Sequence, residues 1–266
     1  MVGCESLSSS SNQHEIKLFN GDNLDGLYTY LRDTQFIDPR NVFSVKDQIL
    51  HISGDGYGYI GTQDVYQDYE LTLEYRWGNF NHNTRKGKAR DAGLFIHATG
   101  MDGGSYDGEG AYMAAIECQI MEGATGDMML IRGKDQQGKN LPMEMSAIVT
   151  GKKDKDGFYW FGLTGEEKTI NTYGRFNWRH KSDKWVDVYG FRAKMDLEKL
   201  YTGFMDPNLK PWNELKVISR EGKIRVVLNG ILVNEVFNVE PRHGKILLQC
   251  EGSSWQVRKM VLRLIK

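Results

Sequence analysis

Strict alternation of apolar and polar side chains from Glu70 to Trp77 constrains this chain most, because it fits a β-strand that packs on one face only. Short runs rich in Val, Ile, Tyr and Phe, about a dozen in all and bounded by turn residues, recur along the chain. Asn229-Gly230 joins two of them and suits the positive φ angles of a tight hairpin. With one weak helical stretch at 196–200, the pattern predicts an all-β fold, a two-sheet antiparallel β-sandwich of jelly-roll type. The expected strands are 49–52, 69–77, 93–98, 112–121, 128–131, 170–176, 185–191, 213–219, 224–228, 231–237, 245–249 and 257–265.

The composition excludes several classes of partner. Thirty Gly and five Pro in 266 residues favour turn-rich β structure, and 34 Lys plus Arg against 35 Asp plus Glu favour neither nucleic acid nor an anionic membrane surface. No run approaches the ~18 apolar residues of a membrane span. Three cysteines form no disulfide framework, and Cys118 and Cys250 are expected to be buried free thiols.

The N-terminal segment differs from the rest of the chain. Residues 1–15 are expected to form a Ser-rich tether, and residues 16–266 a single jelly-roll catalytic domain. Val2-Gly3-Cys4 followed by polar residues resembles the end of a bacterial lipoprotein signal. The sequence therefore predicts a lipid anchor at Cys4 and a place in the cell envelope, with a disordered leader as the alternative.

Polar side chains interrupt the strand-like run from Ile116 to Glu122, where a buried strand would carry apolar residues. Glu117 and Gln119 share one strand face, whereas Glu122 joins that face only if a β-bulge follows Gln119. A second run, from Asp91 to His97, precedes it across a Gly-rich turn, so His97 is expected to face Glu117. Two carboxyls and an imidazole on one patch predict the catalytic site. The loop at 102–110 either forms a mobile rim or supplies oxygen ligands to Ca²⁺.

Several fragments in order along the chain resemble one family, the 3-keto-disaccharide hydrolases, found in Bacteroidetes. The fragments are Leu18-Phe19-Asn20-Gly21, Asp91-Ala92-Gly93-Leu94, Ile116-Glu117-Cys118-Gln119-Ile120, Tyr173-Gly174-Arg175-Phe176-Asn177-Trp178-Arg179-His180, Val188-Tyr189-Gly190-Phe191-Arg192, Leu228-Asn229-Gly230 and Gly244-Lys245-Ile246-Leu247-Leu248-Gln249-Cys250-Glu251-Gly252. The resemblance implies a concanavalin A-like sandwich with a concave sugar-binding face, often secreted or lipid-anchored, acting on sugars oxidised at carbon 3. His97 stands where many members have arginine, which marks a departure from the family pattern.

The resemblance implies cleavage of 3-keto-glycosides by elimination and hydration. A ketone at C3 acidifies the proton at C2, so a base can remove it and the enolate can expel the C1 substituent. We expect Glu117 or Glu122 to act as base and His97 as acid or enolate stabiliser. A divalent ion held by His97, Glu117 and Glu122 would serve the same electrophilic role.

Further polar and aromatic residues are expected to bind the sugar, because aromatic faces stack on pyranose rings and polar groups bind hydroxyls. They are Gln119, Asp91, Arg175, Trp178, Arg179, His180, Tyr189 and Glu251, with Trp178 as readily a core residue. Two alternative functions stay open. One is a retaining β-glucanase using Glu117 and Glu122, a mechanism in which Gln119 replaces a proton-sharing Asp. The other is a carbohydrate-binding lectin without catalysis.

Overall fold

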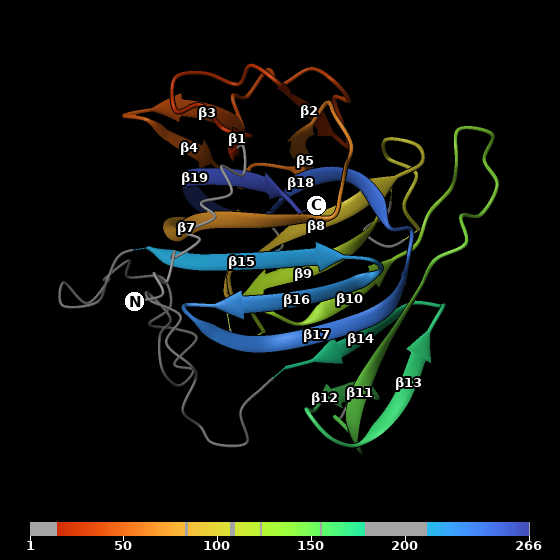
Figure 1. Cartoon of the computed structure of the whole chain (residues 1–266). Coiled ribbons are helices and arrows are strands. Elements are labelled where there is room, and N and C mark those ends of the chain that lie inside the picture. Colours follow the sequence, from red (N-terminus) through yellow and green to blue (C-terminus); the bar gives the residue numbers. More distant parts are fainter. Residues whose placement is uncertain are drawn as a thin grey trace, which may run out of the picture.

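The computed structural model describes residues 15–82, 85–106, 110–122, 124–154, 156–178 and 212–265. These residues form nineteen strands, almost all paired antiparallel, in two stacked sheets (Figure 1). The predicted all-β sandwich of jelly-roll type is confirmed. No described segment forms a helix with the length and apolarity that a membrane crossing requires.

The first sheet, sheet A, has the order β3–β4–β19–β7–β15–β16–β17, with β1 beside β19. Its strands are β1 (Glu15–Lys17), β3 (Phe43–Lys46), β4 (Ile49–Ile52), β7 (Tyr69–Asn81), β15 (Asn213–Arg220), β16 (Lys223–Leu228), β17 (Ile231–Glu240) and β19 (Ser253–Leu264). Asn229 and Gly230 connect β16 to β17 with φ angles of 49° and 85°, so the predicted hairpin is confirmed.

The second sheet, sheet B, has the order β2–β5–β18–β8–β9–β10–β14–β12–β11–β13, and β6 pairs with β18. Its strands are β2 (Leu27–Leu31), β5 (Tyr57–Thr62), β6 (Tyr66–Gln67), β8 (Asp91–Thr99), β9 (Ala114–Met121), β10 (Met128–Ile131), β11 (Glu144–Lys153), β12 (Tyr159–Phe161), β13 (Glu166–Ile170), β14 (Gly174–Asn177) and β18 (His243–Glu251). Because β11 also pairs with β17, one strand belongs to both sheets and joins them along one side.

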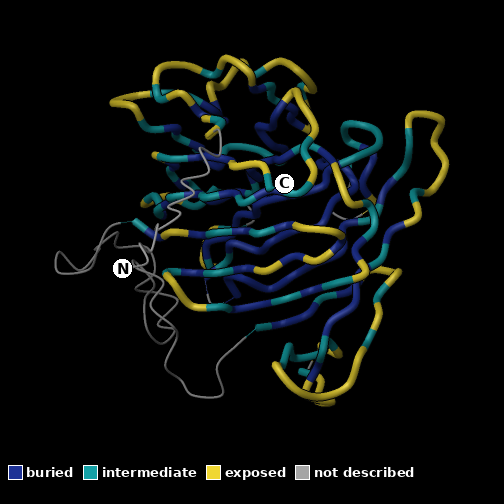
Figure 2. The backbone as a smooth tube through the Cα atoms, viewed as in Figure 1, coloured by how far each residue is buried: buried dark blue, intermediate teal, exposed yellow. Residues whose placement is uncertain are grey.

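The core lies between the two sheets and follows the alternation of the sequence. Leu71, Leu73, Tyr75 and Trp77 of β7 are buried there, as the pattern in 70–77 predicts. Burying a side chain of this size stabilises the fold by about 1.5–3 kcal/mol. Figure 2 shows the buried central strands, and exposed backbone collects at the turns and at the β11–β13 end. Cys118 and Cys250 are buried free thiols in this core, as expected.

Two strand predictions need correction or cannot be placed. Residues 170–176 do not form one strand, because the chain turns between Ile170, the end of β13, and Gly174, the start of β14. The sequence also misses β1, β2, β3, β5, β6, β11, β12 and all of β13 except Ile170, which are short or carry Gly, Tyr or charged residues. The expected strand at 185–191, the helical stretch at 196–200 and Cys4 lie outside the described residues.

Alternation in sheet B leaves a second face that points away from sheet A. Ile116, Cys118 and Ile120 of β9 point into the core, so Glu117 and Gln119 point outward. We call this second face the outer face of sheet B. A separate apolar cluster that includes Phe95 and Leu247 lies on it. The outer face is where the polar residues of several strands meet.

Candidate active site

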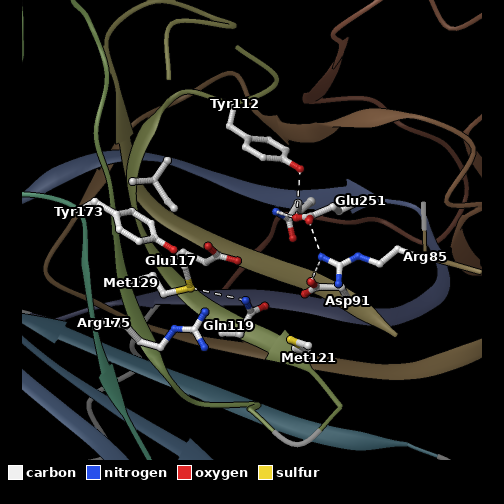
Figure 3. Close-up of a pocket in the computed structure, with 12 residues that line it drawn as sticks. Arg85, Asp91, Tyr112, Glu117, Gln119, Met121, Met129, Tyr173, Arg175 and Glu251 are labelled. Carbon is white, nitrogen blue, oxygen red and sulfur yellow. Dashed lines mark hydrogen bonds and ion pairs between the residues drawn. The ribbon is translucent and has the colours of Figure 1, made fainter. Parts of the chain in front are cut away.

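A cavity of about 480 Å³ opens on the outer face of sheet B. Five strands supply its floor, and three residues outside strands form its sides (Figure 3). The lining residues are Arg85, Asp91, Tyr112, Glu117, Gln119, Met121, Met129, Ile131, Tyr173, Arg175, Gln249 and Glu251. Polar side chains dominate this lining, which suits a hydroxyl-rich ligand.

The register of the strands brings the floor residues together. Asp91 of β8 lies opposite Met121, Gly93 opposite Gln119, and Phe95 opposite Glu117. Met129 of β10 lies between Glu117 and Arg175 of β14. Directly opposed residues share a sheet face, so side chains far apart in sequence meet over one patch.

Glu117 is the most unusual group of the site. Its side chain is buried, with 2 % of the residue exposed, and Oε1 has no hydrogen-bond partner among the described residues. Burial raises the pKa of Glu117 well above its usual range, and the charges of Glu251 and Asp91 raise it further against the opposing effect of Arg175 and Arg85. A carboxylate with a raised pKa is a stronger base than an ordinary glutamate, which suits proton abstraction.

Gly93 makes room for that carboxyl. A methyl group added at Gly93 would lie 2.4 Å from Oε1 of Glu117 and 3.0 Å from Oε1 of Gln249. Both side chains therefore converge over a position where a side chain would force the Glu117 carboxyl to move. The close approach explains a glycine in the middle of β8, where it would otherwise weaken the strand.

Two carboxyls and one guanidinium form the opposite side of the cavity. Arg85 forms an ion pair with Asp91 and another with Glu251, the latter at 2.5 Å between Nη2 and Oε1. Glu251 also accepts hydrogen bonds from Nε2 of Gln249 at 2.7 Å and from the Tyr112 hydroxyl at 3.2 Å. Burial and the charge of Glu251 raise the pKa of Asp91 well above its usual range, and Arg85 offsets part of this. Because one guanidinium balances only one of the two carboxylates, Asp91 and Glu251 can together retain one proton.

Arg175 brings a second cation to the cavity, on the side of Glu117 (Figure 3). Its Nη1 lies 3.5 Å from Oδ2 of the fully buried Asp127, and its guanidinium lies 5.3 Å from the ring centre of Phe158. Asp127 also accepts a hydrogen bond of 2.6 Å from the backbone N–H of Trp178. The Nε of Arg175 is buried without a hydrogen-bond partner in the described part of the chain. This arrangement holds a positive charge where an anion could form.

Five of the predicted site residues line the cavity: Glu117, Gln119, Asp91, Arg175 and Glu251. Trp178 does not, because its side chain packs against the sandwich core. Arg179, His180 and Tyr189 lie outside the described residues.

The prediction that His97 faces Glu117 is wrong. Phe95 lies opposite Glu117, and the register shifts between Ile96 and Thr99, where His97 has a φ of 53°. The imidazole points to the other side and bonds the Pro241 carbonyl at 2.8 Å and the Ser219 hydroxyl at 2.9 Å. Burial lowers the pKa of His97 to about 4, so its ring is neutral near pH 7.

The prediction that Glu122 returns to the face of Glu117 is also wrong. The pairing of β8 with β9 is regular from Asp91 to Ile96, so no bulge follows Gln119. Glu122 instead accepts hydrogen bonds from Arg90, at 2.8 Å from Nε and at 2.9 Å from the backbone N–H. The predicted metal ligands His97, Glu117 and Glu122 therefore do not converge. No other group of three His, Cys, Asp or Glu side chains in the described ranges could hold a metal ion.

Sequence reasoning missed several lining residues. Gln249 gives the same signal as Gln119, an amide at alternating spacing within an apolar strand, and could have been found. Arg85 and Tyr112 lie in turns outside the strands, where periodicity says nothing about direction. Tyr173 belongs to a fragment quoted for the family resemblance but was not assigned to the site.

The fold and the site define a concanavalin-like jelly roll with a polar pocket on its outer face. The chain belongs to the family of 3-keto-alpha-glucoside-1,2-lyase-like domains, whose model matches residues 14–263. This membership places it among glycosyl-hydrolase-like proteins.

The chain is also similar to several solved structures. A Parabacteroides distasonis protein assigned to the glycosyl hydrolases is 14 % identical, with 95 % of this chain and 94 % of that chain covered and a TM-score of 0.51. A second protein of that organism, assigned to the same class, is 15 % identical over 95 % of this chain and 100 % of that chain, with a TM-score of 0.47. A Bacillus licheniformis β-glucanase is 10 % identical over 95 % and 98 %, with a TM-score of 0.44. No curated protein matches the chain in sequence.

Proposed function

We propose that this protein cleaves the glycosidic bond of 3-keto-glycosides by removing the C2 proton, expelling the C1 substituent and hydrating the resulting enone. The family supports this substrate class, and the state of Glu117 supports the chemistry. The observation that carries the proposal is a buried carboxyl without a hydrogen-bond partner for Oε1, in a polar cavity that also holds Arg175.

Glu117 is the base of the proposed reaction. Its carboxylate takes the C2 proton, and the electrons of the C–H bond form the enolate of the C3 ketone. Oε1 of Glu117 is free to accept that proton because no donor among the described residues occupies it. After the C1 substituent has left, the carboxyl exchanges its proton with solvent, and it then delivers a proton to C2 while water adds at C1. The sum of both steps is hydrolysis.

Arg175 stabilises the enolate oxygen. A cation that the fold already holds in place stabilises a developing oxyanion strongly, because it does not have to reorganise during the reaction. Asp127 holds the guanidinium of Arg175 from behind, and Arg175 lines the cavity on the side of Glu117. Arg175 thus takes the electrophilic role that sequence reasoning assigned to His97.

The trio of Arg85, Asp91 and Glu251 supplies the proton for the leaving oxygen. Asp91 is the proposed donor, because its raised pKa keeps it protonated at a higher pH than an ordinary carboxyl. Breaking the C1–O bond then gives a neutral alcohol rather than an alkoxide. Gln119 and Gln249, each with an amide oxygen that lacks a partner among the described residues, orient the sugar hydroxyls.

The glucanase alternative requires Glu122 as a second catalytic glutamate, and the structure does not place it beside Glu117. Glu122 points away from Glu117 and is bound to Arg90, so the two cannot act as nucleophile and acid on one sugar. A lectin without catalysis stays as the alternative outcome of the experiment below.

The test uses the purified protein with a 3-keto-glucoside, with and without added divalent metal, in D₂O. We expect aglycone release and deuterium at C2, both lost in Glu117→Gln by a factor of about 10²–10⁴ while sugar affinity is retained. Glu221→Gln, which changes an exposed carboxyl with 79 % of its side chain accessible, is the matched control and should keep full turnover.

Three results would overturn parts of the proposal. Untouched 3-keto-glycosides, together with sugar binding, would make the protein a lectin. Cleavage of unoxidised β-glucans would favour a glucanase. Full turnover in Glu117→Gln would move the base to another residue.

A further inference from the structure

Asp91 and Glu251 share one counter-charge, and the proposed reaction needs their retained proton on Asp91. Arg85 does not decide where that proton lies, because its Nη2 forms an ion pair with both carboxyls. The surroundings of the two carboxyls differ in two other ways, in exposure to water and in the hydrogen-bond donors that reach them. Both differences bear on which carboxyl carries the charge.

The first difference is exposure. The side chain of Glu251 is 23 % accessible, whereas that of Asp91 is only 5 % accessible. A charge is less costly where water solvates it, so exposure favours an ionised Glu251 and a protonated Asp91. Burial is the main cause of the raised pKa of Asp91, and the positive charges of Arg85 and Arg175 oppose it. Exposure alone therefore leaves the position of the proton contested.

The second difference is the number of donors. Oε2 of Glu251 accepts hydrogen bonds from Nε2 of Gln249 at 2.7 Å and from the Tyr112 hydroxyl at 3.2 Å (Figure 3). Donors to a carboxylate stabilise its charged form, and a proton on Oε2 would compete with them. Oδ1 of Asp91 has no hydrogen-bond partner within the described ranges. An O–H on Asp91 thus displaces no donor and can point to a substrate oxygen.

Gln249 is held in this role by the strand. Gln249 and Glu251 lie two residues apart on β18, so their side chains share one face. The carboxylate can only accept, which fixes the amide nitrogen of Gln249 toward Glu251 and its oxygen on the other side. That oxygen converges with Oε1 of Glu117 over Gly93. One buried amide therefore stands between the proposed acid and the proposed base.

We infer that Gln249, assisted by Tyr112, is a positioning residue that holds Glu251 as the anion of the pair and so keeps the proton on Asp91. This inference rests on the proposed function. As the C1–O bond breaks, its electron pair goes to the leaving oxygen, which takes the proton of Asp91, and the enolate electrons form the C1–C2 double bond. Water that later adds at C1 gives a proton back to the Asp91 carboxylate. Gln249 itself gives up no proton.

The test compares two leaving groups on one oxidised sugar, methyl 3-keto-glucoside and 4-nitrophenyl 3-keto-glucoside, each in both anomers. Nitrophenolate leaves without a proton, whereas methoxide needs one. Aglycone release above the enzyme-free rate gives kcat/KM for each compound. Asp91→Asn is the reference, and it should lower the ratio of methyl to nitrophenyl kcat/KM by about 100-fold or more, because it removes the acid.

Gln249→Met tests the inference itself, because methionine keeps the length of the side chain and removes the donor. We expect the ratio of methyl to nitrophenyl kcat/KM to fall by about tenfold, the effect of one hydrogen bond to a charged group. Tyr112→Phe should lower the ratio less, since its bond is longer. Gln119→Met is the matched control. It removes an amide of the same cavity that donates to Met129 and not to Glu251, so it should lower both values of kcat/KM alike.

A second readout separates positioning from a merely structural role. If departure of methoxide is slowed in D₂O, more of the enolate returns to the substrate with deuterium at C2. Methyl 3-keto-glucoside recovered from Gln249→Met should therefore carry more C2 deuterium per cleavage than substrate recovered from the natural protein, after subtraction of enzyme-free exchange. A general loss of structure would lower exchange and cleavage together. If Gln249→Met does not fold, Tyr112→Phe decides by both readouts.

The possible failures are distinct. If neither compound is cleaved, the proposed function fails and this inference fails with it. Cleavage of the nitrophenyl compound alone by the natural protein would show that no acid acts on the leaving oxygen, which overturns the role of Asp91 and the inference. If Asp91→Asn lowers the ratio but folded Gln249→Met and Tyr112→Phe do not, the inference is wrong and the proposed function stands.

Discussion

Glu117 and Glu122 lie five residues apart on one strand and its end, are almost equally buried, and have opposite surroundings. Glu122 is matched by Arg90, whose guanidinium and backbone N–H both donate to it and whose Nη1 also bonds the Gly78 carbonyl. Glu117 has no such partner, and its nearest charges include two other carboxyls. Burial alone therefore does not mark a functional carboxyl.

The difference lies in which interactions the fold has completed. A buried carboxylate surrounded by donors is stable as an anion and has no reason to exchange a proton. A buried carboxylate with an unused oxygen destabilises the folded state and is ready to react. Glu122 belongs to the first kind and Glu117 to the second, so the same substitution at both positions should separate their roles.

The largest expected effect is on stability. Glu122→Gln leaves the Arg90 guanidinium buried without its counter-charge, and the free energy of unfolding should fall by about 3–5 kcal/mol. Glu117→Gln should leave that free energy unchanged or raise it, because a neutral amide is easier to bury than a carboxylate. Urea unfolding followed by tryptophan fluorescence measures both. Equal losses of unfolding free energy in the two variants would contradict the difference between Glu117 and Glu122.

The next effect is a dependence of stability on pH. Because the pKa of Glu117 is higher in the folded than in the unfolded state, the folded state holds the extra proton and stability falls as pH rises from about 4.5 toward the folded pKa. Glu117→Gln removes this contribution. The variant should therefore gain stability relative to the natural protein as pH increases. A constant difference from pH 4 to pH 9 would contradict the raised pKa.

The same shift predicts the acid limb of the activity profile. A base works only when deprotonated, so kcat/KM for a 3-keto-glucoside should rise with pH through the raised pKa of Glu117. A rate that already reaches its plateau near pH 5 would exclude Glu117 as the base.

A smaller effect is expected from Gly93→Ala. The added methyl would lie 2.4 Å from Oε1 of Glu117, so the carboxyl must move, and kcat should fall by about tenfold or more. In a Glu117→Ala background the same change should destabilise the protein less, because the colliding atoms are gone. Thermal unfolding of the four proteins of this cycle measures the coupling. Strict additivity would show that Gly93 and Glu117 do not touch.

The smallest effect on catalysis should come from His97. His97→Asn keeps a residue that tolerates a positive φ, and kcat should stay within about twofold because the imidazole lies outside the cavity. NMR titration of the natural protein should give His97 a pKa of about 4. Since the unfolded imidazole binds a proton near pH 6.5, stability should fall as pH drops from about 6.5 to 4. Loss of turnover in folded His97→Asn would restore His97 to the mechanism.

Much of the fold could be predicted from the sequence, because burial of one sheet face imposes a period of two. The strand containing Leu71, Leu73, Tyr75 and Trp77 follows that rule as far as Gly78. The hairpin at Asn229 and Gly230 was predictable for another reason, because these residues tolerate positive φ angles. The failures occur where other forces decide. β12 and β13 pair at the exposed β11 end of sheet B with little core contact, so their sequences carry no alternation to detect.

The site was predictable only as far as the strands remain regular. Parity places Glu117 and Gln119 on one face without any knowledge of the rest of the fold. His97 was misplaced because the register shift after Ile96 turns its side chain, and a bulge leaves no dependable mark in a single sequence. Glu122 was misplaced for the opposite reason, a bulge that does not exist. Arg85 and Tyr112 reach the cavity from connections, whose paths depend on tertiary contacts.

The pairing of Arg90 with Glu122 has a consequence for how such sequences diverge. A buried ion pair can be exchanged as a unit for two apolar residues with little loss of stability, whereas either half alone is poorly tolerated. Positions 90 and 122 should therefore vary together among descendants of one ancestor. Position 93 has less freedom while a carboxyl stands at 117, because a side chain there displaces Oε1 from its place in the cavity. Gly93 should therefore be conserved more strictly than the pair of Arg90 and Glu122.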